Sequence, residues 1–252
     1  MLKNLVSAVA SRLGYIVKKR TDGITRSITA SDLDFSSQML MSLIHGKNIY
    51  EGFDYPSFDF DPQGWGSQSP AFGKIIEKHR PQFIIEVGSW KGGSTLTMAK
   101  ELKNQRLDSA VILCIDTWLG AVEFWEDQED QSRFKSLACK HGFPQVYYTF
   151  LANVCHAGFQ NTVIPFPLSS ASAAIWLLKR GASVDAIYID ASHEEQEVYQ
   201  DILDYFPLVR SGGILFGDDW EWLGVRNSVT RYAKQNRLKV DFVDDKWVLK
   251  NS

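Results

Sequence analysis

The sequence predicts an α/β fold in which a mostly parallel sheet is covered by helices on both faces. From about residue 72, short apolar runs alternate with longer segments of helical periodicity, as in doubly wound sheets. With 252 residues, 44% of them hydrophobic, the chain can bury a full core without disulfides. Two short strand-like runs at 239–243 and 246–249 close the chain and predict an antiparallel hairpin at one sheet edge.

The strands of the parallel sheet are apolar, β-branched runs bounded by turn residues, as expected of strands that are buried on both faces. In chain order they are 83–87, 111–115, 162–166, 184–189 and 213–216. For 146–150, a short strand and the approach to the next helix are both open. The expected helices are 72–78, 94–102, 126–141, 171–179, 194–205 and 225–235.

Residues 1–70 lack this alternation, so we expect a helical extension and a lid loop ahead of a Rossmann-like domain at 71–252. Apolar positions in 1–20 recur at helical spacing and are followed by basic residues. We favour a helix packed on the domain or on a second subunit, as in a homo-oligomer. The alternative is a basic helix on a membrane surface. An ordered lid loop rather than a disordered linker is predicted at 50–70, where Asp, Gly and Pro are interspersed with Phe53, Tyr55, Phe58, Phe60 and Trp65.

The composition excludes several classes of protein. A net charge of −3 gives no basic surface for nucleic acid. Three cysteines without a CxxC pair indicate a reducing, cytoplasmic compartment. No apolar stretch reaches the length of a transmembrane helix, and the N-terminus lacks a signal-peptide pattern, so only peripheral membrane association stays open.

A glycine turn follows the first strand and opens a helix. Gly88 and Gly92 allow a tight turn and close approach of a ligand, and the helix N-terminus adds partial positive charge. Glu86 ends the apolar strand and needs a partner, either the amino group of a ligand or nearby N–H groups. Asp116, at the end of the second strand, is placed to bind a ribose hydroxyl or to cap the next segment. A tight connection without any ligand would show the same glycines.

Three aspartates follow two further strands, Asp190 after one and Asp218 with Asp219 after the other. Adjacent parallel strands would bring these mutually repelling carboxylates together. A hard cation such as Mg²⁺ would remove the conflict, bind substrate oxygens and lower the pKa of a hydroxyl. The alternative is that the aspartates cap the following helices. His193, three residues after Asp190, is a candidate general base, with Asp190 as a rival and a purely structural histidine as the alternative.

Residues 86–94, with the pattern E-x-G-x-x-x-G-x-S, followed by Asp116, resemble class I S-adenosylmethionine-dependent methyltransferases of the catechol O-methyltransferase branch. The segments I-D-x-S-H at 189–193 and S-G-G-I-L-F-G-D-D at 211–219 resemble the macrocin (TylF-type) O-methyltransferases, and cephalosporin hydroxylase-like proteins share similar segments. This resemblance implies a magnesium ion held by Asp190, Asp218 and Asp219 beside a sugar hydroxyl. It implies cofactor contacts from the turn, the second strand and the serines near the adenine: Glu86, Gly88, Ser89, Gly92, Ser94, Asp116, Ser169 and Ser170.

Tryptophans gather near the predicted strand ends. Trp118 is expected in a wall of the cofactor or substrate pocket, and an aromatic rim would consist of Trp65, Trp118, Trp125, Trp220 and Trp222. Simple packing of loops onto the domain is the alternative. Together with the resemblance, the rim predicts methyl transfer to a hydroxyl of a small molecule, either a sugar or a glycosylated compound. The alternatives are a catechol-like vicinal diol as acceptor, or a hydroxylase-like scaffold that binds the cofactor without transferring methyl.

Overall fold

The computed structural model describes residues 35–126 and 131–251 and contains a seven-stranded sheet of order β3-β2-β1-β4-β5-β7-β6. β1 to β5 run parallel, while β7 is antiparallel to both β5 and β6. The predicted α/β fold with a closing hairpin is confirmed. The strands are β1 Phe83–Val87, β2 Val111–Asp116, β3 Val163–Pro167, β4 Val184–Ile189, β5 Val209–Gly217, β6 Val240–Val243 and β7 Lys246–Lys250.

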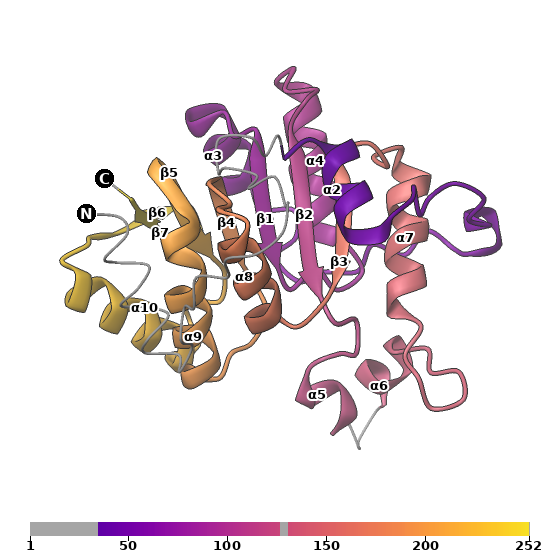
Figure 1. The fold of residues 1–252 in the computed structure, drawn as a ribbon. Coiled ribbons are helices and arrows are strands. Elements are labelled where there is room, and N and C mark those ends of the chain that lie inside the picture. The colour runs from indigo at the N-terminus through magenta and orange to yellow at the C-terminus, as the bar shows by residue number, and fades with distance from the viewer. Residues whose placement is uncertain (1–34, 127–130, 252) are drawn as a thin grey trace, which may run out of the picture.

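Helices connect the parallel strands and surround the sheet (Figure 1). α8, α9 and α10 follow one another around one part of the sheet, and α5 and α6 project beyond the end of β2 (Figure 1). The helices are α2 Ser37–His45, α3 Ala71–His79, α4 Gly93–Asn104, α5 Val122–Trp125, α6 Ser132–Ser136, α7 Val146–Ala157, α8 Ser170–Lys179, α9 Glu195–Tyr205 and α10 Leu223–Asn236, with 3₁₀ turns at Tyr55–Ser57 and Phe206–Leu208.

One expected helix is wrong, and of the two alternatives left open at 146–150 the strand is excluded. The helix predicted at 126–141 is replaced in the described residues by short α6 and a turn, because Ala138 and His141 adopt positive φ and end the helical path. The segment 146–150 is the start of α7 and not a strand, since its residues continue into a helix that buries Val146, Phe150 and Val154 at helical spacing. Aromatic and β-branched side chains there are compatible with either period over so short a run.

The segment ahead of the sheet packs directly onto it. The Tyr50 hydroxyl donates to the Val163 carbonyl at 2.9 Å, and His45 Nε2 lies 2.7 Å from the Pro165 carbonyl oxygen. The predicted helix in 1–20 lies outside the described residues, and the division at residue 70 stays a prediction. Within the part of the chain that the structure describes, no helix has the length and apolarity needed to span a bilayer.

The strand order reverses between β1 and β4, where ligands of such sheets bind. The turns after these two strands touch. Gly88, at φ +85°, lies so close to the Asp190 carbonyl that a Cβ would overlap its oxygen. The glycine turn and the acidic strand end are therefore parts of one site.

Candidate functional site

Glu86 finds its partners inside the protein. The residue is fully buried, and its carboxylate accepts hydrogen bonds from Ser94 Oγ at 2.5 Å and from Thr95 Oγ1. Burial raises the pKa of Glu86, and these hydroxyls oppose the shift. Glu86 thus ties the end of β1 to the first turn of α4. Thr95 was not anticipated, although it directly follows the serine of the motif.

Asp116 holds the glycine turn from the neighbouring strand. Its Oδ2 accepts the N–H groups of Ser89 at 2.9 Å and Trp90 at 2.8 Å, and its Oδ1 accepts that of Trp118 at 2.7 Å. Burial raises the pKa of Asp116 while these N–H groups oppose the rise. The carboxylate fixes Trp90 in its strained conformation at φ +46°. Capping of a helix is excluded for Asp116, because α5 begins only at Val122.

Trp118 lies beneath the turn rather than on a pocket wall. Only 1% of it is exposed, its Nε1 donates to the Trp90 carbonyl at 2.7 Å, and its ring packs on Tyr147 and Phe150. The packing alternative therefore describes this tryptophan. Its indole supports the backbone of the turn from the core side.

The turn carries polar atoms that no described residue satisfies. Trp90 Nε1 and Ser89 Oγ are buried without a hydrogen bond, although the Ser89 hydroxyl lies near enough to Glu86 to lower its pKa. Buried donors without partners are rare and point to a missing ligand or water. Together with the glycines and the start of α4, they fit a ligand that carries hydrogen-bond acceptors.

The lid loop is docked on this turn. Asp61 Oδ2 lies 2.6 Å from Lys91 Nζ, and Asn153 joins the two segments by accepting from Asp61 N–H and donating to the carbonyls of Asp61 and Lys91, each at 2.8 Å. Gly93 lies so close to the lid that a Cβ there would be 2.9 Å from Ser67 Cβ. The sequence did not single out Lys91 or Asn153, because each looks like an ordinary loop or helix residue.

Ser169 and Ser170 start α8. Ser169 is its N-cap and accepts from Ser172 N–H, while Ser170 donates to Asp201 and accepts from the Tyr205 hydroxyl through its carbonyl. Burial raises the pKa of Asp201 to about 7. Both serines have structural partners, and a role near an adenine stays a prediction.

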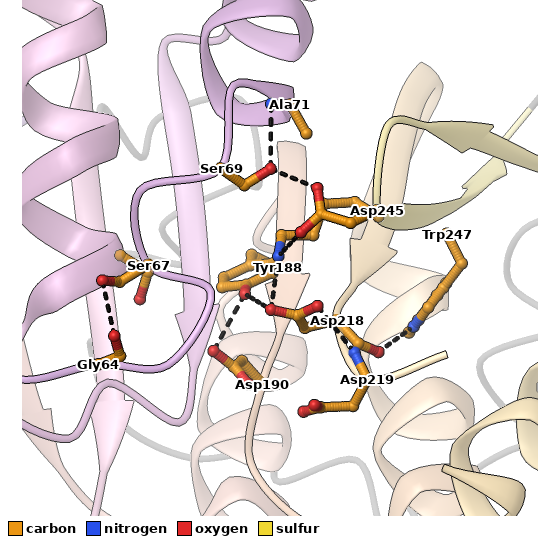
Figure 2. A network of polar contacts seen from close by, with 12 residues as sticks. Gly64, Ser67, Ser69, Ala71, Tyr188, Asp190, Asp218, Asp219, Asp245 and Trp247 are labelled. Carbon is orange, nitrogen blue, oxygen red and sulfur yellow. Dashed lines mark hydrogen bonds and ion pairs between the residues drawn. The ribbon is translucent and has the colours of Figure 1, made fainter. Parts of the chain in front are cut away.

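Asp190 and Asp218, which follow β4 and β5, come together around the Tyr188 hydroxyl, and Asp218 also bonds Lys246. The Tyr188 hydroxyl lies 3.0 Å from Asp190 Oδ2 and 3.4 Å from Asp218 Oδ2 (Figure 2). Lys246 Nζ lies 2.5 Å from Asp218 Oδ2 and 2.8 Å from Asp245 Oδ2. Burial lowers the pKa of Lys246, but the hydrogen bonds to both carboxylates outweigh it and raise the pKa. A buried ammonium was not predicted here.

The aspartates are not helix caps. The N-cap residues of α9 and α10 are Glu194 and Trp222. The donor set also does not fit Mg²⁺, because Asp218 Oδ2 already bonds the ammonium of Lys246 and Asp218 Oδ1 already accepts the Asp219 N–H. In the described residues, no group of three or more His, Cys, Asp or Glu side chains is arranged to hold a metal.

His193 forms a dyad with the third aspartate. Its Nε2 lies 3.0 Å from Asp219 Oδ2, its Nδ1 lies 3.4 Å from Glu123 Oε1, and its ring stacks on Trp222 with centroids 4.6 Å apart. The hydrogen bond to Asp219 raises the pKa of His193, although partial burial opposes the rise. A partly exposed imidazole held by a carboxylate suits proton transfer.

The tryptophans divide into exposed and packed residues. Trp65, Trp222 and Trp125 are 60%, 54% and 42% exposed. Trp65 also meets Phe124 edge to face, with ring centroids 6.1 Å apart. Trp220 packs against Phe242. The exposed group, Trp65, Trp125 and Trp222, is called the aromatic rim below.

Comparison with known proteins gives one matching family and two solved structures of similar fold. The family model described as "Methyltransferase domain" (Methyltransf_24) matches residues 85–220. The solved O-methyltransferase NovP superposes with a TM-score of 0.54 at 13% identity, over 86% of this chain and 98% of that one. TomG from Streptomyces achromogenes, an O-methyltransferase of tomaymycin synthesis solved with SAM, gives 0.51 at 13% identity over 100% of both chains. At such identities the likeness concerns the fold. No curated protein matches.

Proposed function

The chain belongs to the methyltransferase-domain family whose model spans residues 85–220, and from this premise we propose that it is an S-adenosylmethionine-dependent O-methyltransferase. When bound, S-adenosylmethionine supplies an electrophilic methyl group on a sulfonium. The observation that carries the proposal is the contact between the two halves of the site. The glycine turn holds Ser89 Oγ and Trp90 Nε1, which have no hydrogen-bond partner among the described residues. This turn touches the backbone of Asp190 after β4, and the same segment continues to His193, which bonds Asp219.

The residues of the glycine turn divide their work. Ser89 and Trp90 would contact the cofactor, because their buried polar atoms lack partners among the described residues. Gly88 and Gly92 keep the backbone open, both at positive φ. Glu86, Ser94 and Asp116 would act indirectly, since Asp116 bonds the N–H groups of the turn and the Glu86–Ser94 hydrogen bond joins β1 to α4 on either side of it. Direct contacts of Asp116 with ribose, and of Ser169 and Ser170 with adenine, stay predictions.

His193 is the general base of this proposal. The acceptor hydroxyl must lose a proton as its oxygen gains the methyl group, and the lone pair on Nδ1 of neutral His193, which lies 3.4 Å from Glu123 Oε1, can take it. Asp219 then stabilises the imidazolium at 3.0 Å. Asp190 is the weaker candidate, because burial and the charges of Asp219 and Asp218 raise its pKa and reduce its ionised fraction. Asp190 also already accepts from the Tyr188 hydroxyl.

The aromatic rim supports a ring-shaped acceptor. Exposed indoles stack on the apolar faces of sugars and on flat aromatic rings. We propose that the acceptor is a hydroxyl of a sugar or glycosylated small molecule, as in the TylF-type branch. We also propose that the enzyme acts in the cytoplasm. A catechol-like diol and a scaffold without methyl transfer are the alternatives, and a homo-oligomer through the N-terminal region stays a prediction. The sequence predicts magnesium assistance, but the donor set around Asp218 does not fit the ion, so no step of the proposal uses it.

Titration calorimetry with S-adenosylmethionine tests the cofactor. We expect micromolar binding by the full chain, and a loss of about tenfold when Trp90→Phe removes the indole donor, which corresponds to ~1.4 kcal/mol. Trp176→Phe, a tryptophan of α8 that packs on Phe166, is the matched control. Absence of any heat with the wild-type protein would remove the proposal. Transfer of labelled methyl to glycosides, catechols or neither then separates the three acceptor hypotheses.

A further inference from the structure

Lys246 carries a charge to the place where the sequence predicts a metal. It is the first residue of β7, its side chain is fully buried, and its ammonium reaches the Asp218 carboxylate just after β5. A buried ammonium is costly unless charged partners compensate it. Asp218 at 2.5 Å and Asp245 at 2.8 Å provide that compensation.

The lid loop closes over this ion pair. Gly66 passes so near that a Cβ at this position would lie 2.7 Å from Asp218 Oδ2 and 3.4 Å from Lys246 Nζ. Ser69 donates to Asp245 from the same loop, and the Phe72 ring centroid lies 5.4 Å from Nζ. The ammonium is therefore surrounded by backbone, carboxylates and an aromatic face, and the Lys246 side chain has no exposed surface.

The enclosed ammonium and a divalent cation compete for the same oxygen. Mg²⁺ requires ligand oxygens at about 2.0–2.1 Å in octahedral array, and would have to bind Asp218 with Lys246 still beside it. The two positive charges would repel across a buried space where screening is weak. The ammonium of Lys246 is part of the chain, so, unlike a dissolved metal ion, it loses no translational freedom when it lies beside Asp218. The lysine is the cation for which this carboxylate is arranged.

We infer that Lys246 is a built-in substitute for a divalent metal at the ends of β4 and β5. It neutralises Asp218, which leaves the Tyr188 hydroxyl to bond Asp190, and it acts as a positioning residue rather than one that touches substrate. For the proposed function, on which this part rests, methyl transfer is independent of added metal. The acceptor then needs a single hydroxyl, because no metal is present for two adjacent oxygens to chelate.

Manganese binding tests the inference without cofactor or acceptor. Mn²⁺ titrated into the full chain should give no stoichiometric binding at millimolar concentration, measured by electron paramagnetic resonance. Lys246→Gln, which removes the charge, should gain at least tenfold in Mn²⁺ affinity, whereas Lys246→Arg should not. The gain should vanish in Lys246→Gln combined with Asp218→Asn. Lys250→Gln, on the same strand and half exposed, is the matched control.

Two results would overturn the inference. One is wild-type Mn²⁺ binding that Asp218→Asn abolishes. The other is a folded Lys246→Gln, by circular dichroism, that gains no Mn²⁺ affinity. If Lys246→Gln does not fold, the inference is tested by the Mn²⁺ titrations of wild type and Lys246→Arg, neither of which should bind the ion. Failure of the proposed function is distinguishable, because a chain that never binds S-adenosylmethionine can still exclude Mn²⁺. In an active enzyme, EDTA should leave the methylation rate unchanged, and a loss of rate that Mg²⁺ restores would count against Lys246.

Discussion

At the scale of single residues, the imidazole of His193 has one acid on Nε2 and a second near Nδ1. The carboxylate of Asp219 stabilises the protonated ring, so the pKa of His193 is raised in the folded protein. Catalysis by the neutral ring then requires a pH above that raised pKa. Asp219 itself adopts φ +60°, a conformation that asparagine tolerates well.

Asp219→Asn should therefore shift the pH profile in a defined direction. Removing the negative charge lowers the pKa of His193, so the rising limb of the rate against pH should move to lower pH. Above that limb, the rate should fall, because the amide stabilises the imidazolium less. His193→Gln should remove the limb and reduce kcat by about 10²–10⁴-fold. Methylation rates measured from pH 5 to 9 test this, and an unmoved limb in Asp219→Asn would assign the titration to another group.

At the scale of elements, the turn after β1 packs tightly against its neighbours. Its glycines Gly88 and Gly92 differ in what an added Cβ would meet. A Cβ at Gly88 would meet the backbone of the turn after β4, whereas a Cβ at Gly92 would meet side-chain atoms, with the Phe150 ring 3.2 Å away and Thr95 Cβ 4.0 Å away. Backbone atoms next to an added Cβ can move aside less easily than side-chain atoms can. Both residues have positive φ, so both substitutions also carry a conformational cost of about 1–2 kcal/mol.

Gly88→Ala should thus destabilise the protein more than Gly92→Ala. We expect a loss above about 3 kcal/mol for Gly88→Ala, from strain plus overpacking, and about 1–3 kcal/mol for Gly92→Ala. Urea unfolding at constant m-value measures both. The order would be wrong if the two variants lost equal stability, and Gly142→Ala, with φ +78° but open space around it, measures the conformational cost alone.

The sequence could predict the strands and their acidic ends because both depend on local pattern. A buried strand followed by Asp190 or by Asp218 is visible within ten residues. Lys246 is not, since a lysine in a closing hairpin normally faces water and its contact with Asp218 joins positions 28 residues apart. Asp116 was placed correctly at its strand end, yet its hydrogen bonds to the turn depend on the positive φ of Trp90, which no periodicity encodes.

At the scale of the whole molecule, residues from three distant parts of the chain meet over the turn. The lid supplies Asp61, the turn supplies Lys91, and α7 supplies Asn153. Lys91 is buried, whereas the Asp61 side chain is half exposed, so the ion pair itself contributes only about 1 kcal/mol. We expect its larger effect to be on ligand binding, because it holds the lid loop against the turn where the proposed cofactor would lie.

Asp61→Asn should therefore weaken cofactor binding more than it weakens the fold. A ligand that binds only the folded state raises stability by RT ln(1 + [L]/Kd), about 2.7 kcal/mol at 100 times Kd. A lid that opens more often lowers the competent fraction and raises the apparent Kd, so the thermal midpoint should rise less for the variant at each S-adenosylmethionine concentration. Asp59→Asn, an exposed residue of the same loop, should behave as wild type. Equal thermal shifts in wild type and Asp61→Asn would mean that the lid packs on the turn without contributing to the binding of the cofactor.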